Sequence, residues 1–175
     1  LEDDDIPSKK LVKDAVKLFE EKNSLIDVKS SYNGNGFSFG TTERMDGEDV
    51  SVRYQLEPII KGGYRNEQLV GFHFKLPSYI SADDLKLVGL GDHPVKSTPY
   101  NRNGFYQYLL ISAKNINLLQ TIAEKSDDLI DLALKSKLSY DRRDREREEK
   151  RQERTKKLHD NTQSFIKGLT DEFHL

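Results

Sequence analysis

The sequence contains no cysteine, which excludes disulfide bonds, thiolate metal sites and a cysteine nucleophile. It also has no apolar run approaching the roughly 18 residues that a membrane-spanning helix needs. Its first residues, LEDDDIP, are acidic and do not resemble a signal peptide. We therefore expect a cytoplasmic protein that does not enter a membrane. Because the chain begins with Leu1 rather than Met, we interpret it as a piece of a longer protein.

An excess of charge of either sign is also lacking. The 28 Lys and Arg residues nearly balance the 30 Asp and Glu residues, which gives a net charge of −2. Proteins that coat nucleic acid without sequence preference are usually basic overall, so the balance argues against that class. Sequence-specific binding through a local basic face stays open. Hydrophobic residues make up only 35 % of the chain, so we expect part of it to lie outside the core.

Catalytic motifs are absent as well. No serine occupies a nucleophile elbow. A metal-dependent nuclease site could combine Asp92 and His93 with Asn101 or Asn103, but it would lack the second histidine that such sites use. We therefore predict that the protein is not an enzyme and needs neither a metal nor a cofactor. The four histidines are far apart, and none lies at metal-ligand spacing from another: His73, His93, His159 and His174.

The segment PSKKLVKDAVKLFEEK, residues 7 to 22, predicts a helix that starts near Pro7. One face should pack on the core, because apolar residues recur there at helical spacing: Leu11, Ala15, Leu18 and Phe19. Another face is basic, and it is either a solvated outer surface or a surface that contacts phosphates: Lys9, Lys13 and Lys17.

Several segments alternate apolar and polar residues, which is typical of strands with one buried and one wet face. Residues 24 to 42 predict a hairpin around Asn33-Gly34, and residues 50 to 77 predict a second one. The apolar run of residues 105 to 112 favours a short buried strand, with the start of a buried helix as the alternative. The expected fold is α+β, with the N-terminal helix packed on a mainly antiparallel sheet of four or five strands. We assign this domain to residues 1 to 112, and its outer face would carry Arg53, His73 and Lys75.

The turn of the second hairpin is basic and contains Gly62 and Gly63. It is either a solvated turn or a wing, since a helix followed by a hairpin with a charged tip is the minimal winged-helix arrangement. In a wing, the two glycines would allow a close approach of the backbone to DNA. The phosphate contacts of such a protein would be the following cations: Lys9, Lys13, Lys17, Lys61 and Arg65.

The hairpin of residues 50 to 77 resembles the closing hairpin of the winged-helix domains of plasmid replication initiators. The preceding LVKDAVKLFEEKNSLIDV resembles the helix that comes before that hairpin. The resemblance implies a DNA-binding protein of a replication or regulatory system. These residues carry it: Tyr54, Pro58, Lys61, Gly62, Arg65, Phe72 and Phe74.

Residues 113 to 175 predict a helical arm, which is almost entirely charged between residues 140 and 157. Both ends of the arm carry apolar rows, so we expect a coiled coil or another contact with a protein partner or a second copy. The residues expected in this contact are Leu118, Ile122, Leu129, Leu158, Phe165, Leu169 and Phe173.

Two functions are compatible with these patterns. In the first, a non-enzymatic protein binds DNA through the basic helix and the hairpin tip, and self-associates through its C-terminal helices. In the alternative, the chain is a scaffold that oligomerises or docks through residues 115 to 175, without nucleic acid. The charge balance favours the second function, and the lysine row with the hairpin tip favours the first.

Overall fold

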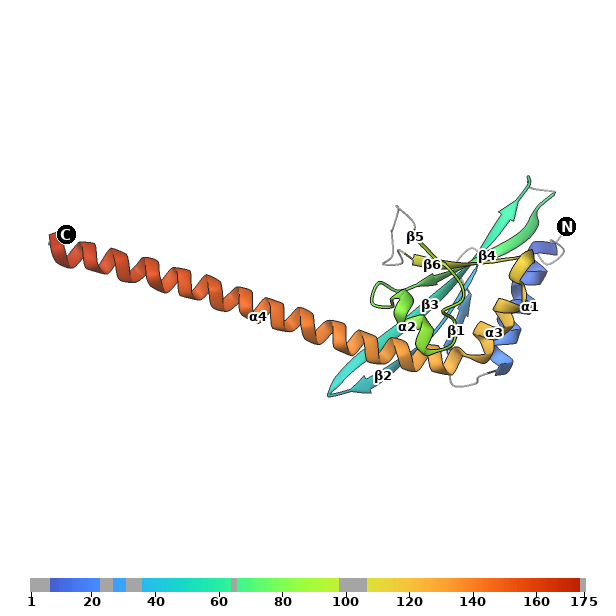
Figure 1. Cartoon of the computed structure of the whole chain (residues 1–175), viewed down its shortest axis with the longest axis horizontal. Helices are drawn as coiled ribbons and strands as arrows, with labels where there is room; N and C mark the ends of the chain where they lie inside the picture. Colours follow the sequence, from blue (N-terminus) through green and yellow to red (C-terminus); the bar gives the residue numbers. More distant parts are fainter. Residues whose placement is uncertain (1–6, 23–26, 31–35, 64–65, 98–106, 174–175) are drawn as a thin grey trace. The chain divides into compact units, whose positions relative to one another are not determined.

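The computed structural model describes residues 7–22, 27–30, 36–63, 66–97 and 107–173, and the side chains from residue 10 onward within these ranges. The chain has the predicted α+β fold (Figure 1). It forms two compact units, Leu1–Lys137 and Leu138–Leu175, which we call the first and the second unit. This boundary differs from the one predicted from the sequence, which lies after residue 112. The first unit extends further because the helices after residue 112 supply residues to its core.

The described part of the chain forms one six-stranded sheet in the order β1-β2-β3-β4-β6-β5, with all neighbours antiparallel. This confirms the predicted antiparallel sheet and both hairpins, although the Asn33-Gly34 turn lies outside the described residues. A sixth strand, β5, forms in a segment for which the sequence patterns above predict no strand. The strands are β1 (Asp27–Ser30), β2 (Phe37–Met45), β3 (Glu48–Lys61), β4 (Gln68–Leu76), β5 (Val95–Ser97) and β6 (Gln107–Ser112).

A third hairpin, which the sequence analysis does not single out, joins β2 to β3. Asp46 and Gly47 form its turn with φ angles of 52° and 82°. Two successive residues at positive φ are typical of the tight turn whose twist suits adjacent antiparallel strands. The turn places Met45 opposite Glu48 and extends the pairing along all of β2.

Helices account for the rest of the described chain: α1 (Pro7–Lys22), α2 (Ala82–Leu87), the 3₁₀ turn η2 (Ala113–Asn115), α3 (Asn117–Glu124) and α4 (Ser126–Phe173). Figure 1 shows α1 and α3 beside each other, and residues of the two helices are in contact. The predicted first helix is confirmed, but its buried side is rotated. Val12, Ala15 and Phe19 face the core, whereas Leu11 is 51 % exposed.

The helices pack on one side of the sheet, which we call the covered face. There, the Phe19 ring of α1 lies 5.0 Å from the Phe39 ring, and Phe39 stacks on Tyr54 at 5.3 Å. The Tyr54 hydroxyl donates a hydrogen bond of 2.7 Å to the carbonyl oxygen of Leu129 in α4. Because Leu129 is also fully buried, the first turns of α4 belong to the core of the first unit.

Replacement of Tyr54 by phenylalanine tests this link between sheet and helix. Removing the hydroxyl should lower the free energy of unfolding by about 0.5–1.5 kcal/mol, the usual net value of one hydrogen bond. Urea titrations of the wild type and Tyr54→Phe at neutral pH measure the difference.

The same pair of proteins should respond differently to high pH. Burial, and secondarily the charges of Tyr79 and Asp84, raise the pKa of Tyr54 above its ordinary value. The unfolded chain therefore ionises this phenol near pH 10 while the folded chain does not, and stability falls as pH rises further, by up to about 1.4 kcal/mol per unit. Tyr54→Phe should lack this loss. Parallel losses in both proteins between pH 9 and 11 would contradict the assignment.

Candidate functional site

The side of the sheet opposite the helices, which we call the open face, carries polar and charged side chains. They alternate along each strand with the residues of the covered face, as the period of a strand requires. One residue from each strand lies in register in a single row across the whole sheet. This row consists of Lys29, Ser38, Gln55, Lys75, Tyr108 and Lys96.

Arg53 ties three strands together beside this row. Its guanidinium donates hydrogen bonds to the Ser38 hydroxyl at 3.0 Å, to an Asp27 carboxylate oxygen at 3.1 Å and to the Asp27 backbone carbonyl at 3.0 Å. Lys29 also contacts the Asp27 carboxylate, at 3.3 Å. Desolvation acts to raise the pKa of Asp27, but the hydrogen bonds and charges of Arg53 and Lys29 outweigh it and lower that pKa.

Gly40 makes the position of Arg53 possible. It is paired with Arg53 on β3 and with Asp27 on β1, so a side chain here would lie under the guanidinium. A Cβ atom at Gly40 would come 2.7 Å from the Cγ atom of Arg53 and would also overlap the carbonyl oxygen of Val52. The absence of a side chain therefore allows the ion pair to cross β2.

The variant Gly40→Ala should lower the free energy of unfolding by about 1–3 kcal/mol, the usual cost of forcing extra atoms into a packed site. Gly63→Ala is the matched control, because a Cβ atom there would meet no atom within 4 Å. Denaturant titrations measure both variants. Equal stability of the two variants would show that Gly40 is not needed for the packing of Arg53.

The centre of the open face combines charges with aromatic rings. Lys75 on β4 pairs with the Glu57 carboxylate on β3. The His73 ring lies 4.5 Å from the ring of Tyr108 on β6, at an angle of 51°. Desolvation, helped by the charges of Lys75 and Lys96 and opposed by Glu57, lowers the pKa of His73. The imidazole is therefore neutral at neutral pH and behaves as an aromatic ring.

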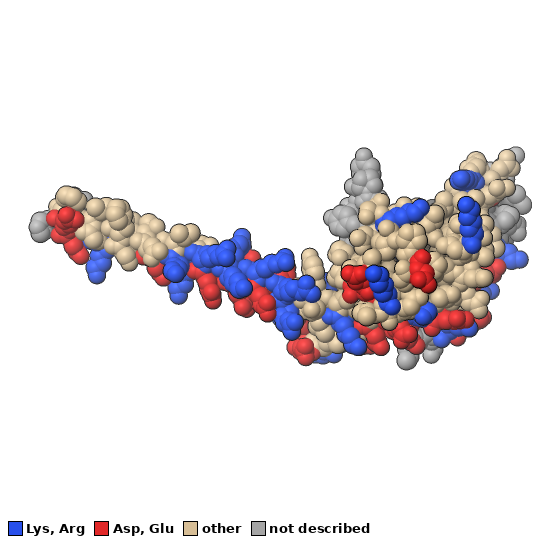
Figure 2. All heavy atoms as spheres, in the orientation of Figure 1, with Lys and Arg blue, Asp and Glu red and all other residues tan. Residues whose placement is uncertain are grey.

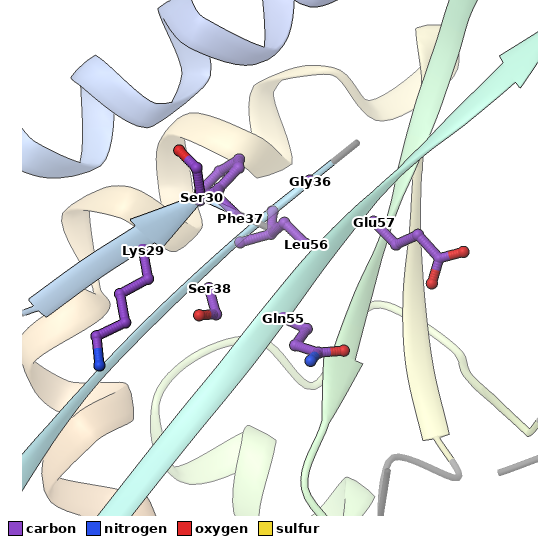
Figure 3. A pocket seen from close by; sticks show the side chains of 8 residues that line it. All are labelled: Lys29, Ser30, Gly36, Phe37, Ser38, Gln55, Leu56 and Glu57. Carbon is purple, nitrogen blue, oxygen red and sulfur yellow. The ribbon is translucent and has the colours of Figure 1, made fainter. Parts of the chain in front are cut away.

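A hollow of about 300 Å³ lies at one end of the row (Figure 3). Figure 3 shows Lys29, Ser38 and Gln55 extending away from the side on which Phe37 lies, as the alternation of the strands requires. The hollow borders Gly36, and the residues just before Gly36 lie outside the described part of the chain. Among the described residues, no group of three or more His, Asp and Glu side chains could hold a metal ion.

The predicted DNA-contacting cations whose side chains the structure describes lie on α1 and at the end of β3. Lys13 and Lys17 are exposed on α1, and Lys61 is exposed at the end of β3. The turn after Lys61 contains Gly62 at a φ of 101°. The backbone N–H of Asn66 donates a 2.9 Å hydrogen bond to the backbone carbonyl oxygen of Gly63. The Lys9 side chain and Arg65 lie outside what the structure describes.

The predicted partner-binding residues separate into two groups. Leu118, Ile122 and Leu129 are no more than 3 % exposed, so they belong to the core of the first unit and are not available to a partner. This corrects the expectation that the apolar row around residues 118 to 138 serves a second chain. These apolar side chains face the sheet instead, because α3 and the start of α4 pack on the covered face of the sheet.

The other group lies on α4 within the second unit and is open to solvent. Leu158 and Phe165 are each 67 % exposed, Phe173 is 61 % exposed and Leu169 is half-buried. Ile166, which the sequence analysis places only beside this row, is 48 % exposed. At 100° per residue these side chains fall within a sector of about 100°, so they form one stripe along the helix. We call these five residues the α4 stripe.

The helix between the first unit and the α4 stripe has no apolar side. Figure 2 shows acidic and basic side chains interleaved over this part of α4. Glu148 and Arg151 form an ion pair of 2.6 Å one turn apart. The hydrogen bond and charge of Arg151 lower the pKa of Glu148 although desolvation opposes them. Such pairs support a helix that stays in water along its whole circumference.

Alternation in the sequence places Lys75 and His73 on the outer face but does not reveal the complete row. Period-2 alternation could have placed Lys29, because Val28 beside it belongs to a predicted strand. No comparable signal marks Lys96, since β5 has only three residues.

Comparisons with known proteins return no match to a family model, to a curated protein or to a solved structure. Within the described residues, every helix is too short or too polar to cross a membrane.

Proposed function

We propose that the protein is a non-enzymatic interaction module that self-associates through the α4 stripe. The observation that carries this proposal is the exposure of Leu158, Phe165 and Phe173, each more than 60 %. Exposure of apolar side chains to water is unfavourable, so a group of them on one side of a helix is stabilised when another surface covers it.

The spacing of the stripe supports another helix as the covering surface. Leu158, Thr162, Phe165 and Leu169 follow each other at alternating steps of four and three residues, which is the spacing of helix–helix seams. Ile166 widens the stripe beyond a narrow two-stranded seam. A second α4 stripe offers the same width and length, about 22 Å from Leu158 to Phe173. We therefore infer a symmetric contact between copies of this chain.

The charged segment before the stripe supports a division of tasks. Residues 140 to 157 hold charges of both signs and no apolar row, so they do not compete with the stripe for a partner. In this proposal the segment is a spacer, and the first unit is the part that self-association brings together. We place the protein in the cytoplasm.

Phe165→Glu should shift the full chain toward the monomer, because a carboxylate in the centre of the stripe cannot be buried without a partner. Multi-angle light scattering over a series of protein concentrations measures the mass. We expect the association constant to fall by about tenfold or more, which corresponds to about 1.4 kcal/mol.

Ser164→Glu is the matched control, because it adds the same charge on the opposite side of the same turn. A chain that ends after Tyr140 should behave like Phe165→Glu. A wild type that is monomeric at all concentrations, or a Phe165→Glu variant that associates as the wild type does, would refute self-association through the stripe.

DNA binding is a second candidate function, favoured by the exposure of Lys17 on α1 and Lys61 at the tip of the β3–β4 hairpin. We propose that Lys9, Lys13, Lys17, Lys61 and Arg65 contact phosphates in this function, in a replication or regulatory system. A glycine at positive φ beside Lys61 supports a close approach of the backbone.

The double variant Lys61→Glu with Arg65→Glu should weaken binding to duplex DNA of any sequence. It should also reduce the slope of log K against log salt by about two, since two phosphate contacts are lost. Fluorescence anisotropy at low salt measures both. The control is Lys114→Glu with Lys135→Glu, which makes the same charge change at exposed positions outside the tip. Equal affinity of the tip variant and the control would refute the wing assignment.

A further inference from the structure

The open face has a combination of side chains that the packing of the first unit does not require. Tyr108 lies in register with Lys75 on one neighbouring strand and with Lys96 on the other. Its ring is only half-buried and lies beside the neutral ring of His73. Aromatic rings on an open sheet face can stack on bases, while adjacent lysines contact the phosphates of the same strand.

The charge of this surface is complementary to a polyanion. Around the row, four cations, Lys29, Arg53, Lys75 and Lys96, accompany two carboxylates, Asp27 and Glu57. Both carboxylates form ion pairs within the sheet: Asp27 with Lys29 and Arg53, and Glu57 with Lys75. Lys96 is exposed and forms no ion pair with any residue that the structure describes. The local excess of positive charge exists although the whole chain has a net charge of −2.

The row is long enough for several nucleotides. Lys29 and Lys96 stand on the two edge strands, and six strands about 4.8 Å apart place them about 24 Å from each other. Between them lie the hydroxyl of Ser38 and the amide of Gln55, which can form hydrogen bonds with the edges of unpaired bases. A duplex would keep its bases away from a sheet face of this kind, whereas a single strand exposes them.

We propose that the open face binds single-stranded nucleic acid, with a base stacked on Tyr108 and phosphates beside Lys96 and Lys29. A peptide of Asp and Glu would use the lysines but has no ring to stack on Tyr108, so the aromatic pair favours the nucleic acid. The proposal depends neither on the α4 stripe nor on the hairpin tip, because it uses other residues.

Fluorescence anisotropy with labelled oligonucleotides of about 12 nucleotides tests the proposal. We use oligo(dT), oligo(U) and a duplex of the same length as probes, each with the full chain at about 50 mM salt. The wild type should bind both single strands more tightly than the duplex. A preference between the first two probes identifies the strand as DNA or RNA.

Two variants separate stacking from charge. Tyr108→Leu keeps an apolar residue in β6 but removes the ring, and it should weaken single-strand binding at least about fivefold, the value of one stacked base. Lys96→Gln should reduce the slope of log K against log salt by about 0.7, as expected for one phosphate contact with a single strand. Thermal unfolding curves that match the wild type show that each variant is folded.

Lys135→Gln is the matched control for Lys96→Gln, because this exposed lysine lies on α4 and not on the sheet. The proposal is overturned if the wild type does not bind either single strand at low salt. It is also overturned if Tyr108→Leu and Lys96→Gln bind as the wild type does, or if only the hairpin-tip variant loses binding. Competition by polyglutamate as strong as that by oligo(U) would identify the face as a general anion-binding surface and would equally refute it.

Discussion

The fold depends on the burial of one aromatic face of the sheet. Phe39, Tyr54 and Phe74 form a continuous stack across three neighbouring strands, and Phe19 of α1 closes it from the helical side. The Tyr54 hydroxyl then finds its hydrogen-bond partner in α4 rather than in water. The helices α1 and α3 and the first turns of α4 all pack on this single face, so within the first unit they leave the other face open. The open face is thus a direct result of how the core is built.

The open face is nevertheless organised. Arg53 crosses Gly40 to reach Asp27, and Lys75 pairs with Glu57, so charges on adjacent strands are held by contacts within the sheet. Exposed ion pairs of this kind contribute little to stability. Their larger effect is to fix side chains in defined positions. If the open face binds a ligand as we propose, this order lowers the entropic cost of binding. The proposed single-strand site depends on this order and on the rings of His73 and Tyr108.

Periodicity in the sequence predicts most of the architecture. Alternation over residues 50 to 56 and 70 to 76 identifies β3 and β4, and helical spacing identifies α1. It does not predict which apolar rows are covered. Leu129 and Phe165 belong to similar rows on one continuous helix, but Leu129 is buried in the first unit and Phe165 is 67 % exposed, and this burial is a tertiary property. The strand β5 is too short to show a period, so the sequence could not reveal Lys96 as part of the row. Leu11 differs from Val12 by one position, a rotation of about 100° that spacing alone does not resolve.

The two edge strands have a further consequence. Both β1 and β5 are very short, with four and three residues, and each carries a lysine on the open face. Short edges with lysines discourage one sheet from adding to another, which is a common route to aggregation. Lys29 and Lys96 therefore have a structural reason to be charged that is independent of any ligand. A chain that loses both would have two backbone edges without a charged side chain to protect them, and copies could join edge to edge into fibres.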